Sequence, residues 1–197
     1  MKNTNKLSTR QLAGLALFTA LVVVLQLLGS FIQFGPVSIQ LVALPIIVGS
    51  ALYGMLAGLW LGFVFSLTVL LTGGAALFMT LNPIGCLLVL FAKGMLCGLA
   101  AGGFYQLLKK KNTILAAVAS ALVCPVVNTG VFIFGCLLFF YPTILGWAQA
   151  AGFGDHATAY MILSFAGLNF LVELIIDVVL CPVIIRLINY GKRDYKR

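Results

Sequence analysis

Charged residues are scarce in this chain, and acidic residues are the scarcest. Lys, Arg, Asp and Glu together make up 8% of the 197 residues, with 4 acidic residues and 1 histidine, whereas 62% are hydrophobic. The mean hydropathy is +1.16. Roughly half of a typical soluble domain is apolar, so a soluble fold of this size could not hide so much apolar surface from water. The composition therefore excludes a soluble domain and indicates an integral membrane protein.

Motifs for catalysis, nucleotide binding and metal binding are also lacking. The sequence contains no GxxxxGK[ST], HExxH or GxSxG pattern and no pair of catalytic carboxylates. We therefore expect neither an enzyme nor a catalytic residue, and no cofactor. The 5 cysteines fall within apolar runs and form no CxxC pair, which favours small buried hydrophobic side chains over disulfides or a metal site.

The apolar runs are too long for the strands of a membrane barrel, which would be about 10 residues long and alternating. We count six runs and predict an all-α integral membrane protein, a single six-helix domain over residues 1–197. The expected helices cover residues 11–30, 40–52, 55–72, 84–108, 113–141 and 158–188. The three intervening loops on the outer side are rich in Gly, Pro and aromatic residues, so we expect them to fold back over the bundle.

The basic residues indicate the orientation. They gather before the first helix, at Lys109–Lys111 between the fourth and fifth helices, and at the end of the chain. With six crossings, all three clusters fall on one side, which the positive-inside rule makes cytoplasmic. Both termini are therefore expected in the cytoplasm. The net charge of +8 is then a topology signal with some attraction to the lipid bilayer, and no nucleic-acid partner is expected.

Small residues recur every four positions on three of the expected helices. Four-residue spacing puts them on one helix face, where backbones can approach closely. The glycine rows favour packing within the bundle. The alanine pair is equally compatible with internal packing and with docking on another membrane protein. The rows are Gly54, Gly58 and Gly62, then Gly94, Gly98 and Gly102, and the pair is Ala16 and Ala20.

Polar residues inside the apolar runs are candidate functional residues, because each is costly to place in a membrane. By depth along their helices, most of them fall within one or two turns of each other. Two interpretations stay open: a buried Lys93–Glu173 ion pair with satisfied amides, or a polar cluster that opens to a pocket. Asn82 before Pro83 is either a helix cap or a ligand contact. The intramembrane candidates are Lys93, Asn128, Thr129, Asn169 and Glu173, with Asp177 one turn deeper.

Four stretches together resemble the substrate-binding S components of energy-coupling factor (ECF) transporters, the vitamin importers of prokaryotes. The resemblance covers about residues 10 to 190. The stretch "VVNTG" is most similar to the pantothenate, folate and riboflavin branch. The four stretches are "LALFTALVVVLQ", "LVALPIIVGSALYGMLAGLWLGFVFSL", "VCPVVNTGVFIFG" and "NFLVELIIDVVLCPVIIRL".

The resemblance implies a subunit in the cell membrane that binds a vitamin under the first and third outer loops, where Gln33 and Trp147 join the expected site. It also implies docking through Ala16 and Ala20 on a membrane coupling subunit powered by two cytosolic ATPases. Pantothenate is the first guess for the ligand, because Lys93 suits its carboxylate and Asn128 its amide or hydroxyl groups. Two alternatives remain at this point: a self-sufficient proton-coupled carrier, and an assembly subunit without a ligand.

Overall fold

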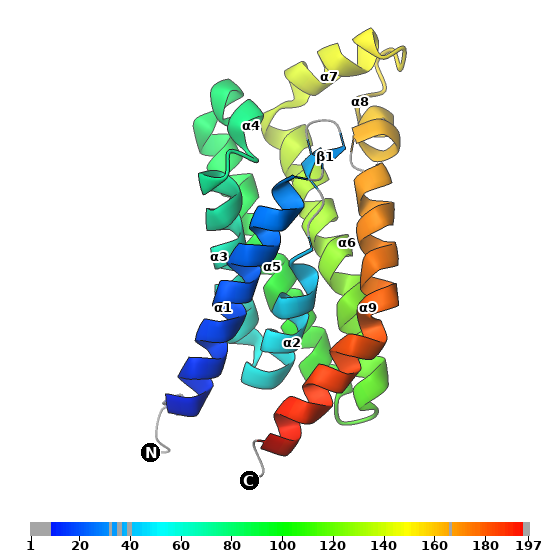
Figure 1. Cartoon of the computed structure of the whole chain (residues 1–197). Helices are drawn as coiled ribbons and strands as arrows, with labels where there is room; N and C mark the ends of the chain where they lie inside the picture. Colours follow the sequence, from blue (N-terminus) through cyan, green and yellow to red (C-terminus); the bar gives the residue numbers. More distant parts are fainter. Residues whose placement is uncertain (1–8, 32, 35–36, 39–40, 166, 195–197) are drawn as a thin grey trace, which may run out of the picture.

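The computed structural model describes residues 9–31, 33–34, 37–38, 41–165 and 167–194, and within these it leaves the side chains of 33–34, 37–38, 165, 168–169 and 192–194 undescribed. Long helices run side by side along one axis (Figure 1), so the expected all-helical class is confirmed. The helices are α1 (Thr9–Ser30), α2 (Ala43–Tyr53), α3 (Met55–Leu71), α4 (Ala76–Leu81), α5 (Pro83–Leu108), α6 (Thr113–Phe139), α7 (Tyr141–Ala150), α8 (Ala157–Tyr160), the π-helix η1 (Met161–Phe165) and α9 (Gly167–Asp194).

Three helices, α1, α5 and α6, are long and apolar enough to cross a membrane, and α2 and α3 are shorter apolar helices. The number of crossings and the side on which the termini lie stay predictions. In addition, β1 (Gln33–Phe34) and β2 (Val37–Ser38) pair antiparallel after α1. This short ladder was not expected from the sequence.

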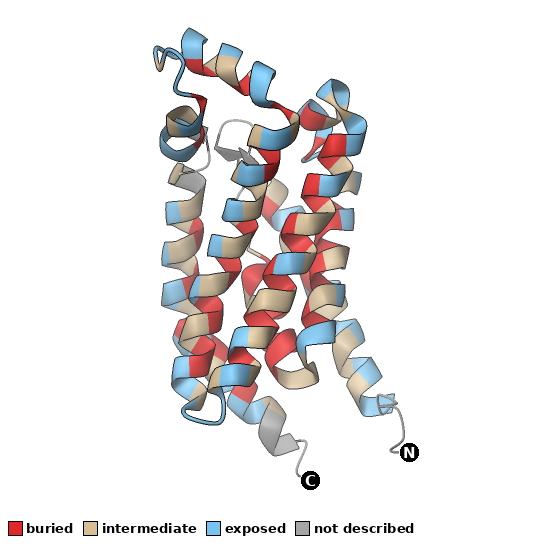
Figure 2. Cartoon of the chain, turned by 180° about the vertical axis from the view of Figure 1, so that it is seen from behind, coloured by how far each residue is buried: buried red, intermediate tan, exposed pale blue. Residues whose placement is uncertain are grey.

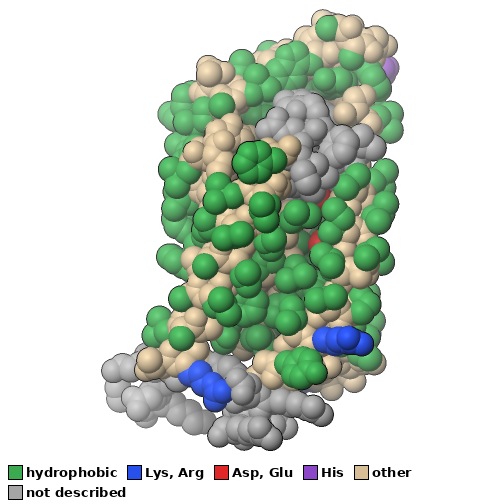
Figure 3. Space-filling view, in the orientation of Figure 1, with side chains coloured by type: hydrophobic (Ala, Val, Ile, Leu, Met, Phe, Trp, Pro, Cys, Tyr) green, Lys and Arg blue, Asp and Glu red, His purple; other side chains and the backbone are tan. Residues whose placement is uncertain are grey.

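The two ends of the bundle differ in character. The start of α1, the end of α9 and the turn between α5 and α6 lie at one end, and α4, α7 and α8 lie at the other (Figure 1). We call these the basic end and the α7 end. On the face in Figure 3, described Lys and Arg side chains appear only near the basic end, below a broad hydrophobic surface. This is the charge distribution that the positive-inside pattern predicts.

Local sequence sets where the long helices begin. Asn82 caps α5, because its Oδ1 accepts a hydrogen bond of 3.0 Å from Gly85 N, and Pro83 occupies the first turn. Asn112 caps α6 in the same way, with a bond of 2.8 Å from Ile114 N. A proline suits the first turn of a helix because its missing N–H would have no partner there.

Two of the expected helices differ from those observed. The expected helix over 113–141 ends at Phe139, and a new helix, α7, begins at Tyr141 and lies across the bundle end (Figure 1). Pro142 in its first turn cannot donate to the preceding turn, so the chain changes direction there. The expected helix over 158–188 is divided into α8, η1 and α9, and α9 continues to Asp194.

Glycines bring α3 and α5 into backbone contact. A methyl group on Gly62 would lie under 3.0 Å from the carbonyl of Gly94, and one on Gly58 would meet Gly98 in the same way. Ser66 adds a hydrogen bond of 2.7 Å from its Oγ to the carbonyl oxygen of Leu90. Close approach of this kind is how membrane helices gain packing energy without a hydrophobic drive between them.

The buried positions face the bundle interior on every long helix, while the outer faces remain exposed (Figure 2). The core includes Ile46 and Ile47 of α2, Leu61 and Phe65 of α3, and Tyr105 of α5. Because α2 is short and buried on most of its surface, it lies inside the bundle and sets the width of the space between α1 and α9.

We expect Gly62→Ala to destabilise the protein by about 1–3 kcal/mol, because the added methyl group has no room against the backbone of α5. Thermal unfolding of the detergent-purified chain measures this. Gly130→Ala is the matched control, because nothing lies within 4 Å of the position that its added methyl group would take and alanine favours a helix over glycine. Equal melting temperatures for the two variants would contradict the proposed role of the glycine contact.

Candidate functional site

Three helices each contribute a pair of side chains four residues apart, so each pair lies on one helix face. The pairs are Lys93 and Cys97 on α5, Cys124 and Asn128 on α6, and Glu173 and Asp177 on α9. Because α5 and α9 run from the α7 end and α6 runs towards it, one member of each pair lies a turn nearer the α7 end. These members form an upper layer of Lys93, Asn128 and Glu173, above a lower layer of Cys97, Cys124 and Asp177.

The ammonium of Lys93 lies between two aromatic rings. Its Nζ is 5.5 Å from the centroid of Phe65 and 5.3 Å from that of Phe132. The side chain is 7% exposed. Cation–π contacts are worth up to about 2 kcal/mol when water is excluded, so the two rings offset part of the cost of burying this charge.

Glu173 supplies negative charge close enough to act on Lys93 electrostatically. Among the described residues, however, no carboxylate lies within salt-bridge distance of Lys93, whose nearest described partners are the two aromatic rings. The direct Lys93–Glu173 ion pair that the sequence left open is therefore not formed in this structure.

A narrow cavity runs beside these layers. It is lined by Asn128, Glu173 and Asp177, by the two thiols of the lower layer, and by side chains from α2 and α3 that include Phe65. Its volume is about 10 Å³, room for about one water molecule. A small area of acidic side chains is visible on the face shown in Figure 3.

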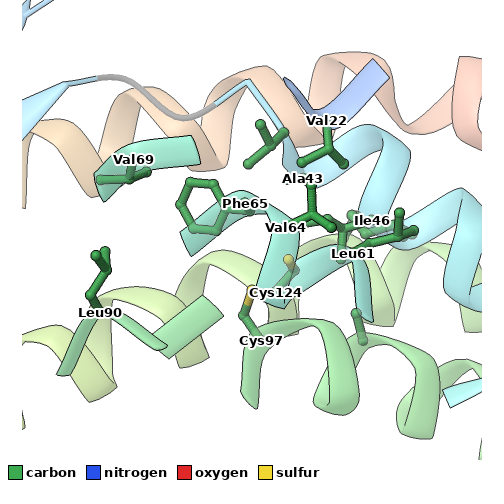
Figure 4. Packing of buried hydrophobic residues seen from close by; sticks show 14 of the residues in the cluster. Val22, Ala43, Ile46, Leu61, Val64, Phe65, Val69, Leu90, Cys97 and Cys124 are labelled. Atoms are coloured by element: carbon green, nitrogen blue, oxygen red, sulfur yellow. The ribbon is translucent and has the colours of Figure 1, made fainter. Parts of the chain in front are cut away.

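The lower layer closes the cavity towards the basic end. The side chains of Cys97 and Cys124 point toward each other (Figure 4). The Cys97 thiol also donates to the carbonyl oxygen of Gly94 over 3.1 Å. All five cysteines are free and buried, as the sequence predicted, and no group of residues suited to a metal ion occurs in the described part of the chain.

An aromatic cluster covers the upper layer on the side of the α7 end. Phe78 of α4 packs edge-on against Phe132, Phe140 and Trp147, with ring centroids 5.7, 5.1 and 6.4 Å apart. Trp147, a predicted site residue, contacts Phe78, which packs against Phe132 beside Lys93. It forms part of a cover over the polar layer.

The structure separates the other predicted residues from this cavity or does not describe them. Thr129 lines a different groove, between α6 and the start of α9, together with Ile133 and Phe170. One residue along a helix is a rotation of about 100°, which takes Thr129 off the face that carries Asn128. Asn82 caps α5, and its role as a ligand contact stays a prediction. The side chains of Gln33 and Asn169 lie outside the described residues.

One buried polar residue was missed by the sequence analysis. Gln26 of α1 is fully buried, and neither its Nε2 nor its Oε1 makes a hydrogen bond with any described residue. A signal for it was present in the sequence, since Gln26 is a polar side chain within a long apolar run. Asp177, named only as a deeper neighbour of the cluster, likewise lines the cavity directly.

The predicted docking pair lies on the outside of the bundle. Ala16 and Ala20 are both exposed on α1. A hydrogen bond of 3.1 Å from Trp60 Nε1 to Thr19 Oγ1 ties a flank of α1 next to this pair to α3. The face that carries the two alanines is therefore available to another protein.

Comparison with known proteins agrees with the resemblance seen in the sequence. A family model described as the substrate-specific component of ECF transporters matches residues 10–185. The pantothenic acid transporter PanT of Lactococcus lactis subsp. cremoris (strain MG1363) is 30% identical over 207 aligned residues, which cover 96% of this chain and 98% of the relative. The chain therefore belongs to the family of ECF transporter substrate-specific components, multi-pass proteins of the cell membrane that are not enzymes.

Proposed function

We propose that this chain is the pantothenate-binding subunit of an ECF importer. The observation that carries the proposal is the likeness to PanT over nearly the full length of both chains. The chemistry of the upper layer supports it. Pantothenate has a carboxylate, an amide and two hydroxyl groups. A buried ammonium lies on α5, and an amide and two carboxylates line the cavity on α6 and α9.

In this proposal Lys93 attracts the ligand's carboxylate, while Asn128 and Glu173 hydrogen-bond its polar groups. Asn169, Thr129, Asn82 and Gln33 stay candidate contacts. Trp147 belongs to the aromatic cover, which keeps water from the ligand and so strengthens these interactions. A cavity of about 10 Å³ is far smaller than a vitamin, so binding has to widen the space between α1, α2 and α9.

Delivery across the membrane is assigned to partners. The chain would dock through Ala16 and Ala20 on a membrane coupling subunit, and two cytosolic ATPases would power the transport cycle. The exposed alanine face of α1 and the lack of any nucleotide-binding motif in the sequence support this division of labour.

Lys93→Met should weaken pantothenate binding by about 10- to 100-fold, because a charge-assisted hydrogen bond in a dry site is worth roughly 1.5–3 kcal/mol. Asn128→Ala should weaken binding as well. Isothermal titration of the purified chain measures both, with riboflavin and folate as competing ligands. Lys110→Met, at an exposed lysine of the basic end, is the matched control. Unchanged pantothenate binding in both site variants would show that the binding pocket lies elsewhere. Tighter binding of riboflavin or folate than of pantothenate would refute the assignment of pantothenate.

Ala16→Trp should leave pantothenate binding intact and abolish uptake, because a large ring on this face blocks close approach of a partner helix. Uptake of labelled pantothenate by cells or proteoliposomes that contain the coupling subunit and ATPases measures the effect. Leu88→Trp, at a position of α5 that is 55% exposed, is the control. Normal uptake by Ala16→Trp, or uptake by the chain alone, would contradict docking through this face.

A further inference from the structure

Asp177 is a buried acid whose surroundings leave one oxygen without a hydrogen bond. The side chain is 4% exposed on α9, one turn below Glu173, and it lines the cavity. Its Oδ2 accepts no hydrogen bond from any described residue. A buried polar atom in this state costs free energy, and inside a membrane the cost is a reason to look for function.

The described neighbours of Asp177 offer it no basic group. In the lower layer it lines the cavity together with the thiols of Cys97 and Cys124. Lys93 lies one turn nearer the α7 end, and the carboxylate that acts on it is Glu173. Arg186 follows nine residues later on α9, about 13 Å along the helix axis, and is exposed.

The two layers beside the cavity differ in charge. In the upper layer the acid Glu173 has the ammonium of Lys93 and the amide of Asn128 near it, whereas the acid of the lower layer, Asp177, has two thiols and no described basic group. A ligand's carboxylate is therefore attracted only to the upper layer, where Lys93 offsets Glu173, and a hydrogen-bond donor suits the acceptor oxygen of the lower layer.

We propose that Asp177 accepts a hydrogen bond from the hydroxyl end of pantothenate while the ligand's carboxylate lies towards Lys93. This inference rests on the proposed function and adds to it the ligand's orientation and a specificity-determining residue. Pantothenate suits these two layers, since its carboxylate and its two hydroxyls stand at opposite ends of the molecule. The two layers are one turn apart, about 5.4 Å along the axis, which an extended pantothenate spans.

The test measures how variants of the chain bind two ligands, one without the hydroxyl groups of pantothenate and one without its carboxylate. The first ligand is a pantothenate analogue in which both hydroxyls are replaced by hydrogen, and the second is panthenol, in which an alcohol replaces the carboxylate. The wild-type chain should bind pantothenate about 10- to 100-fold more tightly than either ligand, the range expected for leaving a buried polar group unpaired. Isothermal titration gives each dissociation constant.

Asp177→Leu should bind pantothenate and the dideoxy analogue with nearly equal affinity and still prefer pantothenate to panthenol. Lys93→Met should show the mirror image, indifference to the carboxylate with preference for the hydroxyls retained. Asp177→Asn keeps the shape and a neutral acceptor, so its hydroxyl preference should fall only in part. If Asp177→Leu does not fold, Asp177→Asn replaces it in the test.

The melting temperature of the ligand-free variants distinguishes a binding role of Asp177 from a structural role. An unpartnered acid replaced by leucine should leave the melting temperature unchanged or raise it, because an apolar side chain is cheaper to bury there. Asp155→Asn, at an exposed acid near the α7 end, is the control for charge alone and should change neither ligand preference nor stability.

Two results would overturn the inference, and they are distinguishable. If the wild-type chain does not bind pantothenate, the proposed function fails and the inference fails with it. If the wild type binds pantothenate, but Asp177→Leu and Asp177→Asn weaken pantothenate and the dideoxy analogue by the same factor, the proposed function survives. In that case Asp177 does not contact the hydroxyl end.

Discussion

A buried lysine in an apolar bundle is the constraint on which the rest of this structure depends. Lys93 is 7% exposed, and its ammonium lies between Phe65 and Phe132 with Glu173 nearby. Such a group is expensive in a membrane protein. Aromatic rings and nearby acids reduce the cost without removing the ammonium's capacity for hydrogen bonds. The bundle thus keeps a cation ready for an anionic ligand while excluding the water that would weaken its attraction.

Close packing elsewhere is what keeps this arrangement in place. The glycine contact fixes α5 against α3, and Ser120 ties α6 to α5 through a hydrogen bond of 2.9 Å to the carbonyl oxygen of Ala101. Lys93 on α5 and Asn128 on α6 therefore belong to two helices that are held together by a direct hydrogen bond. The other side of the cavity is formed by residues of α2 and α9, and α2 lies between α1 and α9 (Figure 1). In the proposed binding mode the ligand widens the cavity on that side.

The sequence predicted the helical class because length and hydropathy determine it directly, and it predicted the family from stretches that extend along most of the chain. It placed the end of the fifth helix within two residues of the observed end of α6, but it expected the following residues to form a loop, whereas they form the helix α7 with Pro142 in its first turn. Periodicity could have separated Thr129 from Asn128. The aromatic neighbours of Lys93 could not be predicted, because Phe65 and Phe132 come from distant helices whose pairing depends on the whole packing arrangement.

The most direct test of this binding mode is an experimental structure of the chain with pantothenate bound. We expect ligand density between α5, α6 and α9, with the carboxylate near Lys93 Nζ, the amide near Asn128, and α1 and α9 farther apart than in the ligand-free chain. Density for pantothenate outside this layer, or a bound ligand whose carboxylate points away from Lys93, would contradict the binding mode.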